Sequence, residues 1–147
     1  MLIKLPLQFP VLFICLLLCA VSFAQLHEDN EPFTVESYYK IKWGHADEFI
    51  ALWKKNHLPL EKEAQKKGDI LSITADKPRL HSGEDTRWDF KVVIVYKTTQ
   101  AAFDHDLTTP YKKKLFPDLE KLAREEKERF ELVIAHWDVM TERVALE

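Results

Sequence analysis

The order in which hydrophobic periodicity changes along the chain constrains its fold more than any other feature. Apolar and polar residues alternate in residues 33–43, the segments 69–75, 88–97 and 131–141 are also predicted strands, and helical spacing separates the first strand from the second and the third from the fourth. Period two indicates a half-buried strand, and a period near 3.6 indicates an amphipathic helix. The order β-α-β-β-α-β is typical of a ferredoxin-like unit. We therefore predict an α+β fold with an antiparallel four-stranded sheet and helices on one face.

Two of the predicted strands carry large apolar side chains on both faces. Tyr38 and Tyr39 are adjacent, so one of them points to each face of the sheet, and Val93 and Val95 lie opposite the other apolar residues of the third strand. Helices on one face leave the apolar groups of the other face without cover. We therefore expect a homodimer in which the sheets of two copies pack face to face.

The first predicted helix contains a histidine on its apolar side and a proline two residues later. Phe49, Trp53 and His57 follow one another at intervals of four residues, so they form one line along the helix. Pro59 has no N–H to donate to the carbonyl of Lys55, and its ring clashes with that carbonyl. We predict a kink in the helix close to His57.

This line of side chains predicts a cavity between the first helix and the sheet. Ligand sites are mostly apolar with a few placed polar groups. We expect a small, largely apolar molecule to bind there, with the imidazole of His57 as the polar group. The alternative is a histidine at the edge of the core that bonds to a backbone carbonyl. The predicted ligand-binding residues are Tyr39, Phe49, Trp53, Trp88, His81 and His136.

Two other histidines are candidates for the same site. His136 and Asp138 are two apart on the last strand and share a face, so the carboxylate can hold the imidazole in one tautomer. An exposed strand end explains the pair equally well. His81 lies in a polar loop that is long enough to be functional and to close over a cleft, or it is a surface residue.

Several classes of cofactor and partner are not expected. The sequence has no HExxH motif, and its three glycines, Gly44, Gly68 and Gly83, are too far apart for a phosphate-binding loop. Neither a metal nor another cofactor is predicted. The net charge is −3, and no basic face alternates with aromatic residues, so nucleic acid is not an expected partner.

The first 24 residues have the pattern of a signal peptide. Lys4 precedes an apolar run that ends in Ser22-Phe23-Ala24, so we expect cleavage after Ala24 and an exported, periplasmic or secreted protein. The apolar run is shorter than the roughly 20 residues of a spanning helix. An uncleaved anchor and a lipoprotein modified at Cys19 are the alternatives, but we expect no stable membrane insertion after cleavage.

The remaining chain is expected to form a flexible tail, residues 25–32, and one domain, residues 33–147. Both cysteines, Cys15 and Cys19, lie in the predicted signal peptide. The exported domain therefore has no disulfide and no thiolate chemistry, and its core alone must hold the fold.

The stretches "YYKIKWGHADEFIALWKKNHLPL", "RLHSG" and "AHWDV" resemble the dimeric α/β-barrel superfamily, in particular its NIPSNAP-like, EthD-like and antibiotic-biosynthesis-monooxygenase-like domains. The resemblance implies that residues 33–147 form a dimeric α/β barrel. It also implies two further functions: a cofactor-independent oxygenase or isomerase with His57 as general base, and a haem-handling protein with His57 or His136 as axial ligand.

Overall fold

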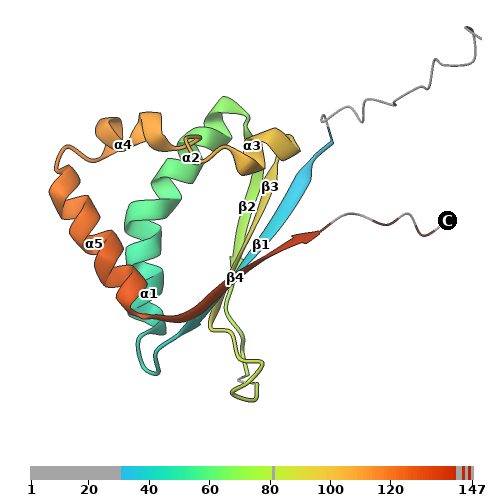
Figure 1. Ribbon diagram of the computed structural model, residues 1–147, viewed down its shortest axis with the longest axis vertical. Helices are drawn as coiled ribbons and strands as arrows, with labels where there is room; N and C mark the ends of the chain where they lie inside the picture. Colours follow the sequence, from blue (N-terminus) through green and yellow to red (C-terminus); the bar gives the residue numbers. More distant parts are fainter. Residues whose placement is uncertain (1–30, 81, 142–143, 145, 147) are drawn as a thin grey trace, which may run out of the picture.

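The computed structural model describes residues 31–80, 82–141, 144 and 146, and it has one sheet with helices on one face (Figure 1). The predicted signal peptide, most of the predicted tail and His81 lie outside these residues. The sheet is antiparallel, open, and ordered β2-β3-β1-β4. This confirms the predicted fold class, while a single chain does not close a barrel. The strands are β1 (Phe33–Ile41), β2 (Ile70–Asp76), β3 (Phe90–Tyr96) and β4 (Val133–Thr141).

The first predicted helix is continuous but changes its geometry in the middle. The backbone N–H of Leu58 donates to the carbonyl of Trp53, a five-residue interval that defines a π-helical turn. Pro59 follows directly, and the wider turn accommodates a residue that cannot complete an α-helical ladder. The expected distortion is therefore present as a π-helical turn. The three parts are α1 (Ala46–Leu52), η1 (Trp53–His57) and α2 (Leu58–Lys67).

The second helical region is divided into three helices. Pro110 lies in the first turn of α4, where a missing N–H costs nothing, so this proline begins a helix. The side chains of Thr98 and Asp118 accept backbone N–H bonds at the starts of α3 and α5. These helices are α3 (Thr99–Phe103), α4 (Thr109–Leu115) and α5 (Leu119–Glu131).

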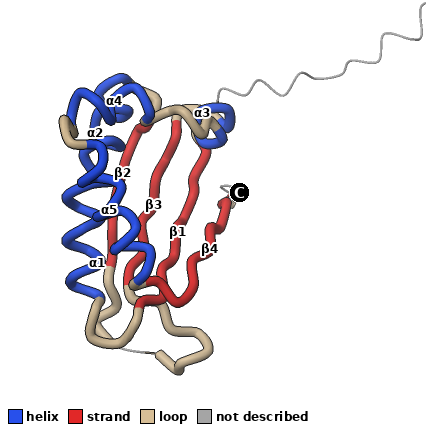
Figure 2. Tube along the Cα trace, turned by 60° about the vertical axis from the view of Figure 1, so that its left-hand side comes forward, coloured by secondary structure: helices blue, strands red, loops and turns tan. Residues whose placement is uncertain are grey.

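The core lies between the sheet and the helix layer formed by α1, η1, α2 and α5 (Figure 2). Strand register places Tyr39 opposite Phe90 and His136 on the helix side of the sheet. Tyr38 points the other way and stacks on Trp137 with ring centroids 5.5 Å apart. The adjacent tyrosines therefore occupy opposite faces, as predicted. No helix in the described ranges is long and apolar enough to cross a membrane.

Candidate functional site

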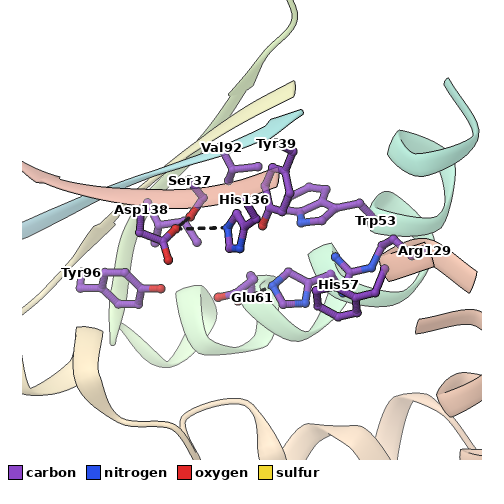
Figure 3. Close-up of a pocket in the computed structure, with 12 residues that line it drawn as sticks. Ser37, Tyr39, Trp53, His57, Glu61, Val92, Tyr96, Arg129, His136 and Asp138 are labelled. Carbon is purple, nitrogen blue, oxygen red and sulfur yellow. Dashed lines mark hydrogen bonds and ion pairs between the residues drawn. The ribbon is translucent and has the colours of Figure 1, made fainter. Parts of the chain in front are cut away.

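A cavity of about 240 Å³ lies between the helix side of the sheet and the helix layer (Figure 3). Strands β1, β3 and β4 provide its floor, and η1, α2 and α5 provide its walls. Its size is just below the roughly 300–1,000 Å³ of sites for drug-sized ligands. The cavity therefore has room for a small molecule.

The helical wall of the cavity carries Trp53, His57 and Glu61. His57 Nε2 lies 3.2 Å from Glu61 Oε1, so the partner of this imidazole is a carboxylate and not a backbone carbonyl. Glu61 is only 6% exposed, and its other oxygen, Oε2, has no hydrogen-bond partner among the described residues. The indole Nε1 of Trp53 also lacks one. This wall thus presents one donor and one acceptor that the described part of the chain leaves unpaired.

The floor of the cavity carries a second imidazole beside a carboxylate. His136 Nε2 lies 3.3 Å from Asp138 Oδ1, and the hydroxyl of Ser37 donates to the same oxygen at 2.6 Å. The imidazole also stacks on Tyr39 with ring centroids 4.3 Å apart. The structure places His136 beside Asp138, the arrangement that one of the two interpretations of this pair expects. Two imidazole–carboxylate pairs therefore line one cavity, one from the helix layer and one from the sheet (Figure 3).

Arg129 enters the cavity from the last turn of α5 and is 3% exposed. Within the described ranges, no carboxylate oxygen lies within 4.0 Å of its guanidinium, and its Nε has no hydrogen-bond partner. The guanidinium carbon lies 4.8 Å from the ring centroid of Phe130 and 5.8 Å from that of Phe49. Burial lowers the pKa of Arg129, because the charged form loses its hydration. The site thus holds a buried cation whose neighbours are mainly aromatic.

Two phenols complete the polar lining. Burial raises the pKa of Tyr39 to about 12, and burial also raises the pKa of Tyr96. Both hydroxyl groups stay protonated at neutral pH and can donate hydrogen bonds.

The structure brings together four of the residues predicted from the sequence: Tyr39, Trp53, His57 and His136 all line the cavity. Phe49 is fully buried in the core and packs on Tyr39 at 5.0 Å between ring centroids, so it contacts the cavity lining without being part of it.

Two predicted residues are not placed in this cavity. Trp88 packs edge-on against Tyr38, with ring centroids 5.8 Å apart, and lines a separate cavity of about 220 Å³ with Arg87. His81 lies outside the described residues, so its predicted position over the cleft stays a prediction.

Sequence reasoning missed Glu61, Tyr96 and Arg129. Glu61 follows His57 by four residues, a spacing that places them on one side of a helix. Arg129 follows Leu122 by seven residues, which places it on the inner side of its helix. Both signals were present and neither was used.

No group of three or more histidine, cysteine, aspartate or glutamate side chains in the described ranges is arranged to hold a metal ion. The imidazoles of His57 and His136 each direct Nε2 toward a carboxylate. Imidazole–carboxylate pairs of this kind can form hydrogen bonds and transfer protons.

No family model and no curated protein matches the sequence, but solved structures share its fold. A protein from Pseudomonas aeruginosa aligns over 80% of this chain and 98% of its own, at 14% identity and a TM-score of 0.51. A dimeric ferredoxin-like protein from an uncultured marine organism aligns over 80% and 95%, at 10% identity and a TM-score of 0.50. An antibiotic-biosynthesis-monooxygenase-like protein from Bacteroides thetaiotaomicron aligns over 78% and 91%, at 13% identity and a TM-score of 0.49. The chain therefore has the ferredoxin-like fold that its resemblance to the dimeric α/β-barrel superfamily predicts.

Proposed function

We propose that the chain is an exported, homodimeric domain that binds a small organic molecule in the cavity between η1, α2, α5 and the sheet. One observation carries the binding proposal. Of the four buried side-chain atoms without a hydrogen-bond partner in the described residues, three belong to residues that line this cavity: Trp53 Nε1, Glu61 Oε2 and Arg129 Nε. Each such atom costs about 1–3 kcal/mol when unpaired, so native proteins keep few of them. That three such atoms belong to one cavity supports the proposal that a ligand binds there and forms hydrogen bonds with them.

A second candidate function is proton transfer to or from the bound molecule, as in a cofactor-independent oxygenase or isomerase. It is favoured by the imidazole of His57, held by Glu61, opposite the His136–Asp138 pair. A carboxylate beside an imidazole fixes its tautomer and supports its action as a base.

Protein purified from its own host is expected to carry a small molecule, seen by native mass spectrometry as a species above the mass of the free chain. Trp53→Phe keeps an aromatic ring but removes the indole donor, so a smaller fraction of this variant should carry the bound molecule. One hydrogen bond of about 1 kcal/mol corresponds to roughly fivefold in affinity. Trp88→Phe is the matched control, since Trp88 lies outside the cavity.

Equal occupancy in the two variants, or no bound species in the wild-type protein, would contradict the binding proposal. The recovered molecule also separates the two candidate functions. A ligand is returned unchanged after incubation with fresh protein, whereas a substrate is converted.

The homodimer proposal rests on the sheet face that the helices leave uncovered. Trp137 and Val139 are 39% and 40% exposed there, and Tyr38 stacks on Trp137. Exposed aromatic and branched side chains on one face are typical of a protein–protein contact. A second copy is the favoured occupant, because one solved structure of this fold is described as dimeric. Export is supported by the signal-peptide pattern of residues 1–24.

Trp137→Lys is expected to convert the dimer to a monomer, because it places a charge in the apolar centre of the proposed contact. Sedimentation at micromolar concentration measures the change. Met140→Lys is the control: Met140 is on the same strand, is 59% exposed, and pairs with Val35 on the helix side of the sheet. A wild-type protein that sediments as a monomer would overturn the proposed dimer.

A further inference from the structure

We infer that the molecule bound in this cavity is a small organic acid whose carboxylate pairs with Arg129. This inference rests on the proposed binding function and adds the chemical class of the ligand. A guanidinium is always charged in proteins and recognises carboxylates with a planar pair of donors.

Arg129 is a buried cation without an anion among the described residues. Arg87 is equally buried, at 3% exposed, but its Nη1 lies 2.7 Å from Asp89 Oδ2 and 3.1 Å from the carbonyl oxygen of Ile41. Within the described ranges, Arg129 has no such partner. Buried charges in folded proteins are almost always paired, because desolvation without a partner is costly. A ligand carboxylate would supply the missing partner.

Each carboxylate of the cavity already lies beside an imidazole, through Oε1 of Glu61 and Oδ1 of Asp138. Glu61 lies beside His57, and Asp138 lies beside His136 and accepts the hydroxyl of Ser37. Among the described residues, Arg129 is the cation of the cavity that has no carboxylate beside it. These two carboxylates also disfavour a doubly charged phosphate, because like charges in one small cavity repel. A singly charged carboxylate fits this charge pattern better.

A second donor lies at the same end of the cavity. Trp53 is 2% exposed, and its Nε1 has no hydrogen-bond partner in the described part of the chain. Figure 3 shows Trp53 and Arg129 toward one end of the site and Tyr96 toward the other. An indole N–H and a guanidinium together provide donors for both oxygens of a carboxylate.

The remainder of the cavity fits a short apolar body. Val92 and Ile94 of β3 form the floor between the Arg129 end and Tyr96. The volume of about 240 Å³ limits that body to about one ring or a short branched chain, since larger sites of roughly 300–1,000 Å³ hold drug-sized ligands. The inferred class is therefore a monocarboxylic acid with a single-ring apolar body.

The test uses matched probes that differ only in charge: benzoate with benzamide, phenylacetate with phenylacetamide, and cyclohexanecarboxylate with its amide. The reporter is the indole N–H resonance of Trp53 in ¹⁵N–¹H correlation spectra, assigned by its loss in Trp53→Phe. The acids are expected to shift this resonance saturably. The amides should bind about tenfold more weakly, as expected when a charge-assisted hydrogen bond is lost.

Two variants locate the effect. Arg129→Gln is expected to abolish the preference for acids, whereas Arg124→Gln, on the same helix with an exposed side chain, should leave it unchanged. Arg129→Lys keeps the charge without the planar fork and should retain the preference at reduced affinity. If Arg129→Gln does not fold, Arg129→Lys is the variant that tests the role of Arg129.

The outcomes separate the inference from the function on which it rests. If an amide shifts the Trp53 resonance as strongly as its acid, the cavity remains a ligand site but the carboxylate assignment is overturned. If Arg129→Gln keeps the full preference, Arg129 is not the partner. If neither member of any pair binds, the proposed binding function fails together with the assignment.

Discussion

Arg87→Met is expected to lower the free energy of unfolding by about 3–5 kcal/mol, the range for removing one partner of a buried ion pair. The side chain of Arg87 is 2% exposed, and its Nη1 reaches both the carboxylate of Asp89 and the carbonyl oxygen of Ile41. Asp89 also accepts the backbone N–H of Ile41 at 2.8 Å. Without the guanidinium, a carboxylate that is only 17% exposed keeps its charge without a cation. Urea denaturation monitored by circular dichroism measures the loss.

Glu84→Gln is the matched control for this prediction. Glu84 also contacts Arg87, with its Oε2 at 3.1 Å from Nε, but its side chain is 55% exposed. Solvent screens an exposed ion pair, so this variant should unfold close to the wild-type midpoint. Equal stability of Arg87→Met and Glu84→Gln would show that the contact of Arg87 with Asp89 and Ile41 does not hold the end of β1.

The fold could be predicted from the sequence because each strand and helix carries a local signal of periodicity or composition. The segment predicted as the last strand, residues 131–141, matches β4 from Val133 onward, since its branched and aromatic residues favour a strand locally. Pro59 predicted a distortion of the helix but not its form. A kink and a π-helical turn both relieve the clash between the proline ring and the carbonyl of Lys55. Helix α4 was missed because Pro110 can end one helix or begin another.

The candidate site could be predicted only where its residues share an element. Trp53 and His57 were found because four-residue spacing puts them on one helix face. Arg129 was missed because the charge density of "AREEKERF" is typical of a solvated helix, whereas the packing of α5 against α1 and η1 buries this position. Trp88 was misplaced because we extended the alternation of β3 backward, whereas the strand begins at Phe90 and Trp88 packs beside Tyr38.

Arg129→Met is expected to have the opposite effect to Arg87→Met and to raise the free energy of unfolding of the ligand-free protein by about 1–3 kcal/mol. Burial lowers the pKa of Arg129, which means that the charged form is less favourable in the folded chain than in the unfolded chain. Methionine fills a similar space with an unbranched apolar side chain. The variant loses the cation–π contacts with Phe49 and Phe130, at about 0.5–1 kcal/mol each, which is less than the several kcal/mol of desolvation.

Urea denaturation of the wild-type protein and of Arg129→Met in the presence of a small carboxylic acid tests whether ligand binding changes stability. A ligand that binds only the folded state stabilises it in proportion to the logarithm of its concentration above Kd. Benzoate or a related acid should therefore raise the unfolding midpoint of the wild-type protein and leave that of Arg129→Met unchanged. Arg87 and Arg129 are both 3% exposed, yet their replacement by methionine would change the free energy of unfolding in opposite directions. The reason is that Arg87 has its anion within the chain, whereas Arg129 receives its anion from the ligand. A loss of stability in Arg129→Met as large as that in Arg87→Met would instead assign Arg129 a structural partner and remove the basis for an acidic ligand.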